Sequence, residues 1–138
     1  MKIYIEKPTT AIADQFYTKL KDNLAIFSAN QITLWTVSDL VGGSNFIEEK
    51  KKQLNTADVV LFLVSSDNLA IIDDYKNEDK KFFTVILSSC LWEYSDIIKS
   101  KAVMLHEKDD KYNSAADKDI FIVNCLKKLL NLLCVEKV

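Results

Sequence analysis

The chain has 138 residues, which is the length of one domain. Apolar residues make up 49% and charged residues 28% of it, proportions typical of a globular protein. The formal net charge of -2 excludes a global field that would draw the chain to nucleic acid or to an anionic membrane. No apolar run approaches the roughly 18 residues that cross a bilayer.

The first predicted elements are a strand at residues 2–6, a helix that begins at Ala11 and a second strand at 32–37. Apolar residues recur every three or four positions along the helix, at Ile12, Phe16, Leu20, Leu24 and Phe27. The second strand is indicated by its β-branched and aromatic residues.

A loop at residues 38–44 carries the chain's only two glycines, and a helix follows it. Asn45 is placed to cap that helix, with Glu48 three residues later, and the helix is predicted to run to about Thr56. The next segment, 58–65, reads DVVLFLVS, and a continuous apolar run predicts a strand that is covered on both faces. We expect one layer of helices to cover Val59, Leu61 and Leu63, and another to cover Val60, Phe62 and Val64.

The second half of the chain continues this alternation. Residues 66–81 are polar and acidic, with space for one or two helical turns near 69–72, and strands are predicted at 82–88 and 102–105. The last helix is predicted to begin near Asp117 and carries an apolar stripe of Ile120, Val123, Leu126, Leu130 and Leu133. Strands that alternate with helices predict an α/β fold, with one open parallel sheet of about five strands and helices on both faces.

Three cysteines and one histidine are the residues to consider for redox or metal chemistry. Cys90, Cys125 and Cys134 each lie in an apolar run, and no two of them have C-x-x-C spacing. We therefore expect three buried, reduced thiols and a cytoplasmic protein. His106 has no partner at metal-ligand spacing, so we expect it at a strand end or on the surface, and we expect no metal site.

Several segments have the order and spacing of a known family. They are Trp35 to Asp39, the pair Gly42–Gly43, the helix from Phe46 to Leu54, the strand from Ala57 to Ser66, and the run from Thr84 to Trp92. In this order the chain resembles a divergent bacterial Toll/interleukin-1 receptor (TIR) domain over nearly its whole length. The resemblance implies a single domain at 1–138 with a flavodoxin-like sheet, which agrees with the fold that the residue patterns predict.

The resemblance implies one of two functions. Some TIR domains are signalling modules that associate with other TIR domains, and others cleave the nicotinamide–ribose bond of NAD with a glutamate just beyond the segment that corresponds to Ser65–Ser66. No glutamate stands at that place here; Asp73 and Asp74 lie nearest, and Glu78 lies four residues before the next predicted strand. We therefore expect an interaction module without NAD cleavage, whose partner is itself or another TIR-like domain. The alternative is a divergent NAD glycohydrolase, activated by self-assembly, in which Asp73, Asp74 or Glu78 replaces the missing glutamate and NAD is the substrate.

Two groups of candidate site residues follow. The predicted interaction loop comprises Ser38, Asp39, Gly42, Gly43, Ser44, Asn45 and Phe46. A candidate pocket at the carboxyl ends of the strands comprises Glu6, Lys7, Trp35, Ser65 and Ser66. Structural roles compete for the pocket residues: we expect Glu6 to be solvated, Trp35 to pack on the first helix, and the serines to satisfy backbone groups at a strand end.

Other classes of partner fit the sequence less well. A small-molecule sensor of the response-receiver type also has this fold but needs an acidic cluster at the end of the first strand, where Glu6 stands alone. The lysines at 50–52 and 127–128 are interpreted as solvated helix faces, because acids are interleaved with them and no aromatic platform accompanies them. We expect no nucleic-acid partner, no membrane partner and no cofactor.

Overall fold

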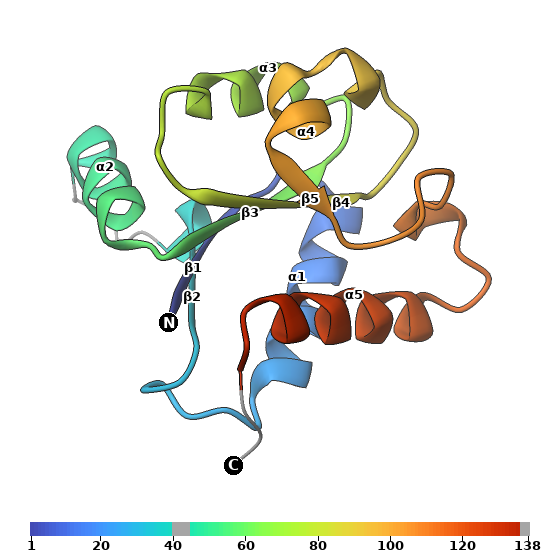
Figure 1. Ribbon diagram of the computed structural model, residues 1–138, viewed down its shortest axis with the longest axis horizontal. Coiled ribbons are helices and arrows are strands. Elements are labelled where there is room, and N and C mark those ends of the chain that lie inside the picture. The colour runs from blue at the N-terminus through green and yellow to red at the C-terminus, as the bar shows by residue number, and fades with distance from the viewer. Residues whose placement is uncertain (40–44, 136–138) are drawn as a thin grey trace.

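The computed structural model of the chain describes residues 1–39 and 45–135 (Figure 1). Its centre is a five-stranded sheet in the order β2-β1-β3-β4-β5, and every neighbouring pair of strands is parallel. The strands are β1 (Lys2–Glu6), β2 (Thr33–Thr36), β3 (Val59–Val64), β4 (Lys81–Ile86) and β5 (Ala102–Met104). This is the flavodoxin-like strand order, so the predicted sheet is confirmed, with each strand within two residues of its expected ends.

Helices cover both faces of the sheet (Figure 1). They are α1 (Ala11–Leu24), α2 (Phe46–Thr56), α3 (Leu69–Ile72), α4 (Asp96–Ser100) and α5 (Lys118–Leu132). Four single 3₁₀ turns lie between them: η1 (Val37–Asp39), η2 (Asp73–Tyr75), η3 (Trp92–Tyr94) and η4 (Tyr112–Ser114). The predicted cap of α2 is confirmed, because the Glu48 N–H donates to Asn45 Oδ1 at 3.2 Å. Asp117 caps α5 in the same way, with Oδ1 accepting from the Ile120 N–H at 3.0 Å.

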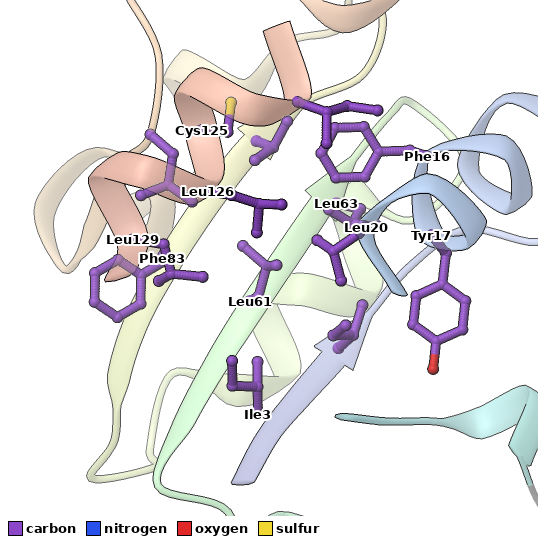
Figure 2. Packing of buried hydrophobic residues seen from close by; sticks show 14 of the residues in the cluster. Ile3, Phe16, Tyr17, Leu20, Leu61, Leu63, Phe83, Cys125, Leu126 and Leu129 are labelled. Atoms are coloured by element: carbon purple, nitrogen blue, oxygen red, sulfur yellow. The ribbon is translucent and has the colours of Figure 1, made fainter. Parts of the chain in front are cut away.

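The central strand β3 separates two hydrophobic clusters. Its side chains alternate as predicted: Val59, Leu61 and Leu63 pack with α1 and α5 (Figure 2), whereas Val60, Phe62 and Val64 pack with α2, α3 and α4. All six side chains are at most 2% exposed. Burying each of these side chains contributes about 1.5–3 kcal/mol to the free energy of unfolding. Because the side chains point alternately to the two faces, β3 packs against both layers of helices.

The prediction of three buried thiols is correct only for Cys125. Cys125 lies inside α5, where burial raises the pKa of its thiol to about 12. Cys90 is half-buried and Cys134 is exposed. The prediction is wrong for Cys134 because α5 ends at Leu132, and Cys134 takes a positive φ of 55° beyond it, so the apolar period of the helix no longer sets its direction.

Within residues 1–39 and 45–135, no helix combines the length and the apolar character that crossing a bilayer requires.

Candidate functional site

The candidate site lies where the carboxyl ends of β1 and β3 meet. The chain leaves β1 toward β2 on one side and returns through α2 to β3 on the other, so the strand order reverses between β1 and β3. Ligands of open parallel sheets bind at such a switch point. Glu6 is the last residue of β1, and Ser65 follows β3 directly.

Glu6 is buried, with only 6% of its surface exposed, so the prediction that it is solvated is wrong. Asn68 Nδ2 donates to Glu6 Oε2 at 3.2 Å, and the Tyr75 hydroxyl donates to Glu6 Oε1 at 3.1 Å. Both partners come from the short segment after β3, which folds back over the end of β1. The carboxylate is therefore buried with a hydrogen bond to each oxygen, as burial of a charged group requires.

A second tyrosine extends this network. The Tyr4 and Tyr75 hydroxyl oxygens lie 3.1 Å apart, and the two rings meet edge to face at 6.0 Å. A hydroxyl has one proton, so a Tyr75 hydroxyl that donates to Glu6 accepts from Tyr4. Burial raises the pKa of Tyr4 to about 12 and also raises the pKa of Tyr75, so both hydroxyls stay protonated at neutral pH.

The electrostatics of Glu6 are set by opposing influences. Burial raises the pKa of its carboxyl group, while the hydrogen bonds from Asn68 and Tyr75 and the charges of Lys50 and Lys7 act in the lowering direction. Lys50 Nζ lies 5.8 Å from the centroid of the Tyr75 ring. Lys7 has a side chain that is only 6% exposed, and its Nζ is paired with Asp14 at 2.8 Å. A carboxyl group in these surroundings can exchange a proton or stabilise a positive charge beside it.

Ser65 and Ser66 have different surroundings. The Ser65 N–H donates to Asn68 Oδ1 at 3.0 Å, and Asn68 Nδ2 also donates to the Leu63 carbonyl at 2.8 Å. Ser65 is buried and its hydroxyl donates to Asp67 at 3.1 Å, whereas Ser66 is exposed. Ser65 thus shapes the turn after β3, and Asn68 links that turn to Glu6. Sequence reasoning missed Asn68, although an asparagine shortly after a strand, here four residues beyond Val64, is a common turn former.

Trp35 packs on Tyr4, with ring centroids 5.1 Å apart, and not on α1. The predicted contact with the first helix is therefore wrong. The register explains the difference, because Tyr4 and Trp35 are neighbours in the β1–β2 pair and share the face that α2, α3 and α4 cover.

Asp39 joins the turn after β2 to α1. Its Oδ2 accepts from the Thr36 N–H at 3.0 Å and from the Tyr17 hydroxyl at 3.2 Å. Burial first, and then the charge and hydrogen bond of Asp39, raise the pKa of Tyr17. Of the predicted interaction loop, Ser38 and Asp39 form part of η1 and are exposed, and Asn45 caps α2. Gly42, Gly43 and Ser44 lie outside the described residues.

Comparison of the chain with family models, with curated proteins and with solved structures finds no match.

The first turn of α2 exposes two adjacent large apolar side chains. Phe46 is 51% exposed and Ile47 is 74% exposed. Glu48 and Glu49 follow them directly in the same turn. An apolar pair bordered by charged residues is the composition of a small contact surface.

Asp73, Asp74 and Glu78, the carboxylates expected to replace the missing glutamate, lie in different surroundings from Glu6. Asp73 and Asp74 belong to η2 and are exposed, and Asp73 faces Lys76 at 3.9 Å. Glu78 is half-buried and lies beyond η2, where its N–H donates to the Tyr75 carbonyl at 3.0 Å. In the described part of the chain, no three His, Cys, Asp or Glu residues gather as metal ligands would.

Proposed function

We propose that the chain is a TIR-like interaction module that associates with a second copy of itself through the first turn of α2 and the η1 turn before it. The exposed pair Phe46 and Ile47 is the observation that carries this proposal. Leaving two large apolar side chains exposed to water is unfavourable, and association removes that apolar area from water. The buried face of α2, by contrast, is provided by Leu54 near its other end.

Charge and anchoring support the same surface. Glu48 and Glu49, followed by Lys50, Lys51 and Lys52 on the same helix, provide a rim of both charges beside the apolar pair, which the same helix of a second copy can match. The hydrogen bonds from Thr36 and Tyr17 to Asp39 fix η1 to β2 and α1. A rigid turn loses less conformational entropy when it binds, which favours its use in an interface.

The experiment that tests this proposal is sedimentation velocity of the purified chain over a range of concentrations. We expect concentration-dependent association that Ile47→Glu abolishes. Ile120→Glu is the matched control, because Ile120 is 57% exposed in the first turn of α5, and this variant should associate like the native chain. Circular dichroism should show that both variants are folded. A native chain that stays monomeric, or an Ile47→Glu variant that still associates, contradicts the proposal.

A second candidate function, cleavage of the nicotinamide–ribose bond of NAD, is favoured by the buried carboxyl group of Glu6 at the switch point. When that bond breaks, the electron pair leaves with nicotinamide, positive charge develops on the ribose carbon, and water supplies the new hydroxyl. A nearby carboxylate stabilises such a charge. Asn68 and Tyr75 occupy both oxygens of Glu6, so this candidate also requires the segment after β3 to move aside.

An assay that incubates concentrated protein with NAD and measures the release of nicotinamide separates the two candidates. The interaction-module proposal expects no release. Release that disappears in Glu6→Gln and persists in Asp74→Asn, while both variants stay folded, would establish the second candidate with Glu6 as its carboxylate. Release that instead disappears in Asp74→Asn would assign catalysis to η2.

A further inference from the structure

His106 makes a hydrogen bond that only its neutral ring can make. The Ile86 N–H donates to His106 Nε2 at 2.9 Å, and His106 Nδ1 lies 2.8 Å from the Glu107 carbonyl oxygen. A carbonyl only accepts, so Nδ1 carries the proton and Nε2 carries the free electron pair. These two contacts together define one neutral tautomer.

The ring takes the place of a missing strand neighbour. The ladder between β4 and β5 ends at Thr84 and Met104, and the Leu105 N–H donates to the Thr84 carbonyl at 3.1 Å just beyond it. Two residues after Thr84 on β4, the Ile86 N–H has no β5 carbonyl opposite it in this ladder. The His106 side chain accepts its hydrogen bond in place of a backbone carbonyl. The ring therefore satisfies a strand-end donor that would otherwise lack a protein acceptor.

The same segment is tied to β4 at a second, adjacent point. The Asn113 N–H donates to the Leu87 carbonyl at 2.8 Å, and Tyr112 beside it is fully buried. Phe121 of α5 lies 5.1 Å from the His106 ring, centroid to centroid. The segment 105–114, between β5 and α5, is thus held on the carboxyl end of β4 by His106 on one side and Asn113 on the other.

We propose that His106 is a pH-operated latch: it holds residues 106–111 on the end of β4 when the ring is neutral and releases them when the ring is protonated, while Leu105, Tyr112 and Asn113 keep the two ends of the segment in place. Protonation at Nε2 places two N–H donors opposite each other, so the bond to Ile86 is lost. The charged ring then has carboxylates to turn toward on its own segment, at Glu107 and Asp110.

The surroundings of the ring permit this movement. A cavity of 240 Å³ borders the ring and is lined by Leu105, Glu107, Asp110, Phe121, Asn124 and Lys128. Lys128 is the charged group that α5 contributes, and its Nζ donates to the Met104 carbonyl at 2.9 Å. On β4 the residue in contact with the ring is the apolar Ile86. A cationic ring is thus repelled from the side of α5 and attracted to the side of Asp110.

The direction of the pH response follows from the same surroundings. Burial lowers the pKa of His106 below its ordinary value of 6.5, with Lys128 acting in the same direction and the Glu107 carbonyl and Asp110 opposing it. The latch is therefore closed at pH 7 and opens below pH 6.5. Because the unfolded chain binds the proton first as the pH falls through this window, the free energy of unfolding decreases there.

Amide exchange followed by NMR tests the latch. We expect the protection factor of the Ile86 amide to fall about tenfold between pH 7.5 and 5, the loss of roughly one hydrogen bond, with the midpoint at the pKa of the His106 ring. His106 is the only histidine in the chain, so its ring signals identify themselves. The Leu63 amide, inside β3, is the reference for global unfolding, and its protection should fall less than that of the Ile86 amide.

His106→Gln is the matched variant, because it offers an uncharged acceptor that does not titrate. We expect its Ile86 amide to be protected equally at pH 7.5 and pH 5. Constant protection of Ile86 in the native chain while the His106 ring titrates overturns the proposal, and so does a pH dependence that persists in His106→Gln. The titration of the native chain decides the matter by itself if the variant does not fold.

Discussion

Replacing Tyr75 with phenylalanine removes one oxygen atom from the buried network at the switch point. That hydroxyl donates to Glu6 Oε1 at 3.1 Å and lies 3.1 Å from the Tyr4 hydroxyl. A hydrogen bond to a charged acceptor contributes about 1.5–3 kcal/mol, and a buried hydroxyl left without a partner costs about 1–3 kcal/mol. Since relaxation recovers part of this sum, we expect Tyr75→Phe to lower the free energy of unfolding by about 2–4 kcal/mol.

The pH dependence of this loss is a sharper test than its size. Burial raises the pKa of Glu6, so the folded state retains the Glu6 proton to a higher pH than the unfolded state does. Between the pKa of Glu6 in the unfolded chain and its higher pKa in the folded protein, the free energy of unfolding decreases as the pH rises. The hydrogen bond from Tyr75 opposes the raised pKa, and Tyr75→Phe therefore raises the pKa further. We expect a larger loss of stability at pH 8 than at pH 5.

Urea unfolding at pH 5 and pH 8 measures both effects. Tyr94→Phe is the control, because Tyr94 is 83% exposed and removal of its hydroxyl should change the free energy of unfolding by less than about 0.5 kcal/mol. A loss below about 0.5 kcal/mol for Tyr75→Phe at both pH values, or a larger loss at pH 5, refutes the reasoning about the Glu6 network.

Two further variants test the core and the η1 turn. Leu61→Ala should lower the free energy of unfolding by about 2–5 kcal/mol in the same urea assay, because Leu61 is 1% exposed at the centre of the sheet. A loss below about 0.5 kcal/mol would mean that β3 is not the central strand. Asp39→Ala removes the acceptor for Thr36 and Tyr17 and should cost about 1–2 kcal/mol. It should also lower the pKa of Tyr17, observed by NMR titration of the ring, and an unchanged Tyr17 pKa would count against the assigned hydrogen bond.

The fold was predictable because its signals are local or strongly periodic. A strand covered on both faces needs apolar residues at every position, and the run from Val59 to Val64 meets that need without interruption. The caps of α2 and α5 are likewise visible in the sequence, because a cap depends on residues three positions apart.

The candidate site was only partly predictable. Glu6 and Ser65 could be named because they stand at strand ends, but the burial of Glu6 depends on Asn68 and Tyr75, which are more than sixty positions away in sequence. The segment that brings them there has one α-helical turn and one 3₁₀ turn, too short for periodicity to reveal. Besides the turn-forming Asn68, the available signal was the spacing of Ile72 and Tyr75, which are three positions apart and both buried.

The outermost strands of the sheet are its shortest, with four residues in β2 and three in β5. An extended peptide that adds to a sheet edge relies on a long row of free main-chain groups, and these edges offer few. Beyond β5, the His106 ring and Leu105 already occupy the next positions on β4. Pairing of copies strand to strand, as in cross-β assemblies, is therefore disfavoured at both edges of the sheet. The proposed association through the first turn of α2 would instead rest on side chains, and one charge introduced there would be enough to separate the copies.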